Sequence, residues 1–204
     1  MREIRTCNAE LKRVQQYAVE VTLDPDTANP HIILSSNWKQ VRYQDVKKDS
    51  LDNPERFSTC LCVLGKKSFS SGRFYYEVMV QGKTNWDLGV ARESINRKMN
   101  IKLSPGNGYW TVTLRERNKY LACTSPPVLL SLREKPQKVG VFVDNEEGQV
   151  SFYDVEARSH IYSFTGYTFT EKLYPYLGPC VNYGTELCPS DHLSCQSHKL
   201  RMTF

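Results

Sequence analysis

The chain has 204 residues, of which 40% are hydrophobic and 11% aromatic, so it can bury a substantial core and is unlike a disordered chain. Its net charge of +5 comes from 27 Lys and Arg interspersed with 22 Asp and Glu, without a basic stripe, so nucleic acid is not an expected partner. No stretch reaches the roughly 20 apolar residues of a membrane-spanning helix. The N-terminus also lacks the apolar core of a signal peptide.

The seven cysteines form an odd set. Cys60 and Cys62 alternate with Leu61 and Val63, which is typical of small side chains in a strand and not of a disulfide framework. We therefore expect a soluble protein in the reducing cytoplasm.

Residues 1–21 carry apolar side chains at alternating spacings of three and four: Ile4, Cys7, Leu11, Val14, Ala18 and Val21. This heptad pattern predicts a helix, either the end of a longer coiled coil or a single amphipathic helix lying on the domain. Two heptads are too short to dimerise by themselves. Pro25 ends the helical pattern because proline lacks an amide donor and restricts the residue before it.

Short extended segments follow the proline. The pattern predicts strands at residues 32–34 and 39–43, and a third at residues 60–64. The polar residues 44–56 between them are expected to form a long surface loop.

The centre of the chain, residues 71–93, contains the most regular strand pattern. Alternation predicts one face made of Phe74, Tyr76, Val78 and Val80, and an opposite face made of Tyr75, Glu77 and Met79. A polar, glycine-containing turn leads into a second strand at residues 86–91, followed by an expected loop at residues 92–106.

Two hairpins come next, pairing residues 109–114 with 119–123 and residues 139–143 with 149–153. Strands at residues 161–164 and 174–177 complete the pattern. Many short strands with turn signals between them, and no helical pattern after residue 21, predict an all-β, antiparallel two-sheet β-sandwich.

Several of these strands carry motifs that resemble the PRY-SPRY (B30.2) domain. The matching blocks are Leu23-Asp24-Pro25-Asp26-Thr27-Ala28, Phe74-Tyr75-Tyr76-Glu77-Val78, Trp86-Asp87-Leu88-Gly89-Val90-Ala91, Gly108-Tyr109-Trp110, Val139-Gly140-Val141-Phe142-Val143-Asp144 with Val150-Ser151-Phe152-Tyr153, and Leu173-Tyr174-Pro175. They occur in the family's order over residues 20–189.

The resemblance implies a bent sandwich of the concanavalin-like jelly-roll type with a short N-terminal helix. It divides the chain into residues 1–21 (helix or coiled-coil end), 22–72 (PRY segment and junction), 73–189 (SPRY segment, in one sandwich with PRY) and 190–204 (flexible tail).

Catalytic motifs are missing from the sequence. His31, His160, His192 and His198 lie outside any nucleophile-elbow, zincin or phosphate-loop pattern, so this chain is not expected to be an enzyme. Cys188, His192, Cys195 and His198 follow one another as C-x3-H-x2-C-x2-H, a weak zinc candidate whose spacing matches no common zinc knuckle. We therefore expect no cofactor, and zinc only in the RING and B-box domains of the parent protein that the family resemblance implies.

Binding at a surface is the expected function. The resemblance implies recognition by a loop rim from both segments, here Glu93, Thr113, Arg115, Val181, Asn182 and Tyr183. Relatives that bind antibody carry tryptophans at the positions of Thr113 and Arg115, so antibody binding is not expected. Trp86 and Trp110 alternate with polar residues in their strands and are expected in the core.

The resemblance also implies the biological setting. The expected function is to select protein targets for a tripartite-motif E3 ubiquitin ligase in innate immune or antiviral defence, with a coiled-coil homodimer as parent and a monomeric isolated domain. A NOD-like receptor could carry the same module.

A further alternative is a butyrophilin-like domain that binds a small phosphorylated ligand. In this chain that family's pocket histidine is replaced by Asp87 and its arginine after Tyr120 by Leu121, which leaves Arg97 and Lys98 as basic candidates. A carboxylate beside a phosphate would weaken binding.

Overall fold

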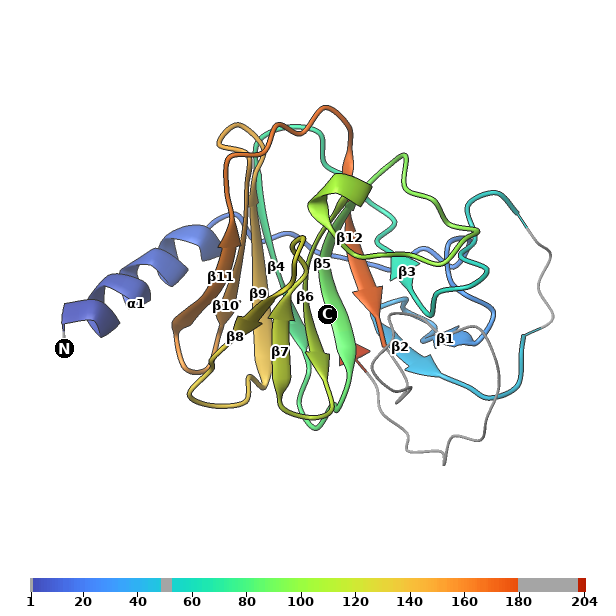
Figure 1. Cartoon of the computed structure of the whole chain (residues 1–204), viewed down its shortest axis with the longest axis horizontal. Coiled ribbons are helices and arrows are strands. Elements are labelled where there is room, and N and C mark those ends of the chain that lie inside the picture. Colours follow the sequence, from blue (N-terminus) through green and yellow to red (C-terminus); the bar gives the residue numbers. More distant parts are fainter. Residues whose placement is uncertain (1, 49–52, 180–201) are drawn as a thin grey trace.

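The computed structural model describes residues 2–48, 53–179 and 202–204, with side chains from residue 9 onward. In these described ranges, two antiparallel sheets pack face to face, with one α-helix at the N-terminal end (Figure 1). The first sheet has the order β1 (Ile32–Leu34), β2 (Gln40–Tyr43), β13 (Met202–Thr203), β4 (Arg73–Met79), β9 (Lys138–Asp144), β10 (Gln149–Asp154) and β11 (Ser159–Phe164). The second has the order β3 (Val63–Leu64), β12 (Leu173–Gly178), β5 (Trp86–Arg92), β6 (Tyr109–Arg115), β7 (Lys119–Ala122) and β8 (Val128–Leu130). The all-β sandwich expected from the alternation is confirmed.

The main core lies between the two sheets. Phe74, Tyr76, Val78 and Val80 of the β4 region all point into it and are at most 3% exposed, as their alternation predicts. Trp86 and Trp110 are also core side chains.

The sheets approach closely at Gly89. Its φ is +151°, and a Cβ there would lie 2.1 Å from the backbone oxygen of Trp110. Across the sandwich, the Tyr76 hydroxyl donates a hydrogen bond of 2.6 Å to the Gly89 carbonyl. The glycine is therefore required by both its backbone conformation and its lack of a side chain.

A second buried cluster covers the outer face of the six-stranded sheet. Ile95, Ile101 and Leu103, from the expected loop at residues 92–106, pack with Phe57 and Tyr176. As expected for a loop, residues 92–106 are irregular and contain only the short 3-10 helix η1 (Pro105–Asn107). Their apolar side chains are nevertheless buried in this second cluster.

The N-terminal helix α1 (Arg2–Gln15) ends earlier than the heptad pattern predicts. After it the chain is extended beside β4, where the Tyr75 amide donates to the Tyr17 carbonyl and the Val19 amide donates to the Tyr75 carbonyl, both at 2.8 Å. These sheet-like hydrogen bonds replace the last turns of the expected helix.

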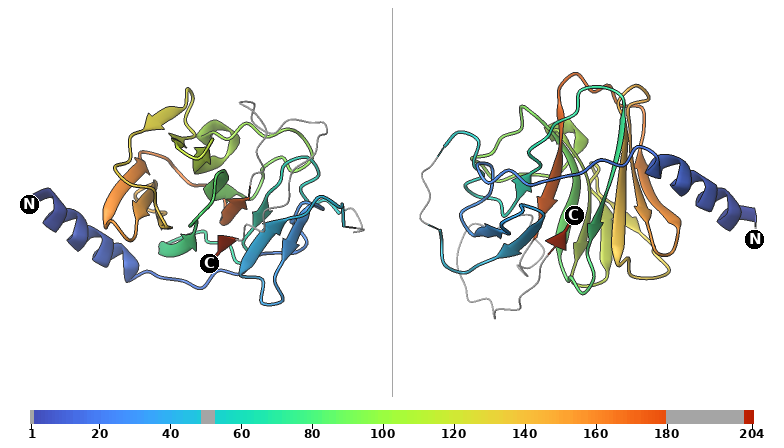
Figure 2. Two further views of the ribbon diagram at one scale, coloured as in Figure 1. Left: turned by 90° about the horizontal axis from the view of Figure 1, so that it is seen from below. Right: turned by 180° about the vertical axis from the view of Figure 1, so that it is seen from behind.

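The C-terminal half of α1 lies on the domain. Leu11 is 4% exposed and Val14 is 2% exposed, and both pack with Tyr75, Phe142 and Tyr153 on the outer face of the seven-stranded sheet. The last turns of the helix therefore bury apolar side chains against the domain. Both views in Figure 2 show the helix projecting from one side of the sandwich.

Two strands were missed by the sequence analysis. β8 follows Ser125-Pro126-Pro127, which reads as a turn. β13 falls in the expected flexible tail, but it pairs with both β2 and β4, and Met202 is 0% exposed. Residues 190–201 of that tail lie outside the described residues. Within the described ranges, no helix is long and apolar enough to cross a membrane.

Candidate partner-binding site

Arg115 closes β6 and is held in place by an ion pair. Its Nη2 donates to Oδ1 of Asp87 at 2.6 Å, and its Nη1 donates to the backbone oxygens of Trp86 at 3.1 Å and Leu114 at 2.9 Å. Asp87 is 3% exposed, while the Arg115 side chain keeps 24% of its surface exposed. Arg115 is therefore anchored at its base and still available at the surface.

Thr113 lies directly opposite Asp87 in the β5–β6 register and is only 1% exposed. The sequence analysis predicts that Thr113 contacts a partner, but its side chain is buried, because β6 lies between β5 and β7 in the middle of the sheet. Cys123 is close by, and its pKa is raised to about 11 by burial and by the charge of Asp87. The thiol therefore stays protonated at neutral pH and is a poor nucleophile.

Glu93 lies at the opposite end of the same strand pair. Asp87 pairs with Thr113 near the start of β5, and Glu93 comes six positions after Asp87, just beyond the end of β5. At roughly 3.3 Å per residue, Glu93 lies about 20 Å from Asp87 and Thr113 along the strand direction. In Figure 1 the end of β5 lies at the top of the sheet and the β6–β7 turn at the bottom. The predicted rim is thus divided between two ends of the sandwich.

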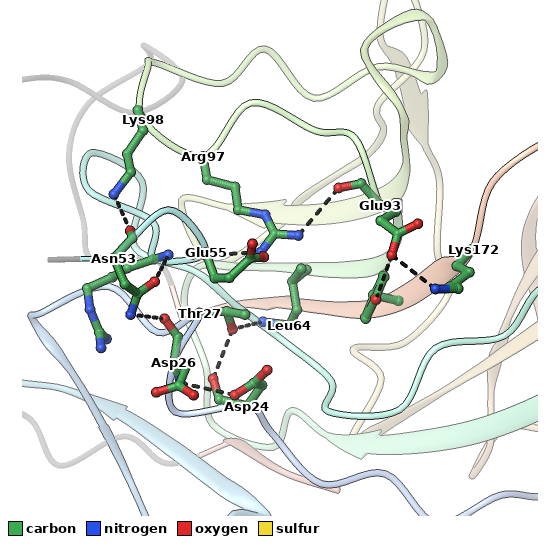
Figure 3. Close-up of polar contacts among 12 residues, drawn as sticks. Asp24, Asp26, Thr27, Asn53, Glu55, Leu64, Glu93, Arg97, Lys98 and Lys172 are labelled. Carbon is green, nitrogen blue, oxygen red and sulfur yellow. Dashed lines mark hydrogen bonds and ion pairs between the residues drawn. The ribbon is translucent and has the colours of Figure 1, made fainter.

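Glu93 faces a cleft at the PRY–SPRY junction with a volume of about 280 Å³. This cleft, here called the junction cleft, is lined by Pro54, Glu55, Glu93, Ser94, Ile95, Arg97 and Tyr174. The Glu93 side chain is 47% exposed, and its Oε1 accepts hydrogen bonds from Lys172 Nζ and the Tyr174 hydroxyl, both at 3.3 Å (Figure 3). These partners are themselves on the surface, so the carboxylate remains accessible.

Arg97 forms the wall of the junction cleft. It is 8% exposed, forms an ion pair with Glu55, and donates to the Glu93 carbonyl at 3.3 Å. The neighbouring Lys98 Nζ donates to the Asn53 carbonyl at 2.6 Å (Figure 3). Both basic residues that the phosphate-binding alternative would use therefore join the PRY loop to the SPRY loop.

The Leu23–Ala28 motif shapes the floor beneath this loop. The Thr27 hydroxyl donates to the Asp24 carbonyl at 2.9 Å and accepts from the Leu64 amide at 3.0 Å, while Asn53 Nδ2 donates to the Asp26 carbonyl at 3.2 Å. Figure 3 shows these contacts below Glu55 and Arg97. The motif therefore joins β3 to the 53–56 loop.

A model of the SPRY domain matches residues 73–189, and a model of the SPRY-associated domain, PRY, matches residues 21–69. The chain belongs to the SPRY family, as a PRY-SPRY domain.

Relatives of this PRY-SPRY domain include Nuclear factor 7, ovary, of Xenopus laevis, which is 54% identical over 77% of this chain and 26% of its own length. Human E3 ubiquitin-protein ligase TRIM68 is 44% identical over 84% of this chain and 36% of its own length. The chain therefore spans about a quarter to a third of these relatives. Among solved structures, the TRIM65 PSpry domain aligns with a TM-score of 0.75 at 21% identity, covering 95% of this chain and 93% of that one. That likeness supports the fold.

Part of the predicted site lies outside the described residues of the PRY-SPRY domain. This applies to the rim residues Val181, Asn182 and Tyr183 and to the zinc candidates Cys188, His192, Cys195 and His198. In the described ranges, no group of three or more His, Cys, Asp or Glu could hold a metal ion.

Sequence reasoning missed the roles of Asp87 and Glu55. The sequence pattern treats Asp87 only as the replacement of a pocket histidine, and it places Glu55 in the expected surface loop of residues 44–56. Their partners are 28 and 42 positions away in the chain. No local pattern indicates such pairs, although a lone acidic residue inside an otherwise apolar strand, as in Trp86-Asp87-Leu88, does indicate that a cation lies nearby.

Proposed function

We propose that this PRY-SPRY domain binds protein targets for an E3 ubiquitin ligase of the tripartite-motif class. The observation that carries the proposal is the 44% identity to E3 ubiquitin-protein ligase TRIM68 over 84% of this chain. The chain covers 36% of that relative. We assign the ligase chemistry to other parts of a parent protein. This chain's part is recognition.

The described surface supports recognition by charge and hydrogen bonding. At one end, the half-exposed Glu93 carboxylate lies beside the phenol of Tyr174. At the other end, the ion pair with Asp87 already fixes the guanidinium of Arg115. Less side-chain conformational entropy is therefore lost when Arg115 binds a partner. Arginine and tyrosine are frequent binding hot spots. A target contacts either end, or spans both.

The wider setting belongs to the same proposal. We place the parent protein in the cytoplasm, as a coiled-coil homodimer acting in innate immune or antiviral defence, with the isolated domain monomeric. The family resemblance supports this setting. Dimerisation would raise the avidity for a repetitive target.

The test is a ubiquitination reaction with the full-length parent and a target captured by this domain. Glu93→Lys is expected to lower capture and target ubiquitination at least tenfold, because it reverses an exposed charge whose contacts are all on the surface. Glu156→Lys is the matched control, since Glu156 is exposed in the β10–β11 turn. Deleting the domain should abolish target modification and leave autoubiquitination. Target modification that survives the deletion would reject the proposal.

A further inference from the structure

β8 exposes apolar side chains at the edge of the six-stranded sheet. Leu129 is 66% exposed and Val128 is 42% exposed, and they are two of six large hydrophobic side chains that the described residues leave exposed. Leu129 pairs with the half-buried Leu121 on β7. Leu121 and Leu129 therefore lie side by side on one face of the sheet and form an apolar surface, here called the β8 patch, while Val128 pairs with Ala122 and lies on the opposite face.

Among the residues that the structure describes, no strand lies beside the outer edge of β8. There β8 is the last strand of its sheet and pairs only with β7, through Tyr120–Leu130, Leu121–Leu129 and Ala122–Val128. An edge strand presents unpaired amide and carbonyl groups, to which an extended segment can add by main-chain hydrogen bonds. The exposed leucine offers such a segment an apolar contact as well.

The surroundings of the β8 patch are basic. Residues 115–119 and 131–138 contain six Lys and Arg against two Glu. Arg115 and Lys138 form ion pairs with Asp87 and Glu77, which lie outside these ranges, so six positive charges face four negative ones and the local excess is two. The register places the end of β8 beside the start of β7, and in Figure 1 the β6–β7 turn and the connection from β8 to β9 both lie at the lower end of the sheets. In the described part of the chain, neither Arg117 nor Arg133 has an ion-pair partner.

The basic turn is also rigid. Glu116 and Arg117 both have positive φ values, of 52° and 70°, as a tight hairpin turn requires. The Glu116 amide donates to Asn85 Oδ1 and the Arg117 amide to the Thr84 carbonyl, both at 3.0 Å. The turn is thus fixed to the neighbouring β4–β5 turn, so little backbone conformational entropy is lost when the turn binds a partner.

We propose that the β8 patch binds an extended, acidic segment of a protein target, which adds to the edge of β8, places an apolar side chain on Leu129 and aligns its carboxylates with Arg117 and Arg133. The inference rests on the proposed function and names the chemistry of the target segment. A second copy of this chain fits poorly, because it would bring the same positive charges together.

The experiment selects binding peptides from a random 12-residue display library on the whole chain. Selected peptides should be rich in Asp and Glu and should carry Leu, Val, Ile or Phe at alternate positions. The tightest peptide, synthesised and labelled, should bind at least tenfold more weakly to Leu129→Asp and to Arg117→Glu/Arg133→Glu. Its affinity should also fall with added salt. Two N-methylated versions of the peptide, one with methyl groups on the odd-numbered amides and one on the even-numbered amides, should differ. Only the version whose methyl groups face β8 should lose binding.

Val46→Asp and Lys47→Glu/Lys102→Glu are the matched controls, because Val46 is 77% exposed and lies in the PRY segment. Peptides without acidic enrichment, or peptides that bind Leu129→Asp as well as the original chain, would overturn the inference. So would selective binding of single-stranded RNA in place of peptides, or dimerisation of the chain through β8. A target that still requires Glu93 but binds Leu129→Asp normally would sink this inference and leave the proposed function intact.

Discussion

Replacing Arg115 by methionine tests how much of the β5–β6 site is structural. Methionine keeps the aliphatic stem and removes the guanidinium from Asp87, which is 3% exposed. Breaking a fully buried ion pair costs about 3–5 kcal/mol. The Arg115 side chain is 24% exposed, so water reaches one partner and we expect a loss of about 2–3 kcal/mol in the free energy of unfolding. The melting temperature should fall by roughly 4–12 °C.

The assay is urea unfolding followed by tryptophan fluorescence, since Trp86 is the residue before Asp87. Asp87→Asn and the double variant complete a cycle, in which the double variant should be about 2 kcal/mol more stable than the sum of the single losses predicts. Arg133→Met, which removes a side chain with no ion pair among the described residues, should change stability by less than about 0.5 kcal/mol. Additive losses in the cycle would refute the view that the Asp87 charge is what makes Arg115 necessary.

Three other predictions concern the scaffold. Gly89→Ala should prevent folding or lower the free energy of unfolding by more than about 4 kcal/mol, because the new Cβ would collide with the β6 backbone. Gly106→Ala, which has open space around it, should change the free energy of unfolding by less than about 0.5 kcal/mol. Expression yield and thermal melting of the two variants test this. Met202→Ala should cost about 2–4 kcal/mol in chemical denaturation, and Thr203→Ala much less, because only Met202 is fully buried. Burial lowers the pKa of Lys83 to about 8, so the unfolded chain binds more protons than the folded chain between pH 8 and 10.5. Stability should therefore rise with pH in that window relative to Lys83→Met, and a parallel pH profile of the two proteins would contradict this.

Much of the fold could be predicted from local pattern. Where one face of a strand is buried, side chains alternate with period two, and this is enough to place β4, β5, β6, β9 and β10 to within a residue or two. β8 was missed because its side chains are mostly exposed and show no alternation. The signal exists only where burial imposes it.

The candidate site was less predictable. Glu93, Thr113 and Arg115 were chosen together from family resemblance, but the antiparallel register separates Glu93 from the other two and buries Thr113. Whether a strand residue is exposed depends on which strands flank it and on what covers the sheet. That information lies in contacts between residues far apart in the chain.

The amino-acid sequence by itself determined the class of this protein, all its described strands except β8 and β13, and the two inter-sheet tryptophans, because hydrophobic alternation and turn chemistry act between near neighbours. Only the tertiary structure decided that α1 ends at Gln15 and packs on Tyr75, and that β13 pairs between β2 and β4. It also decided that Asp87 forms the ion pair with Arg115. Each of these depends on long-range packing, in which a buried group must find its partner wherever the chain brings one.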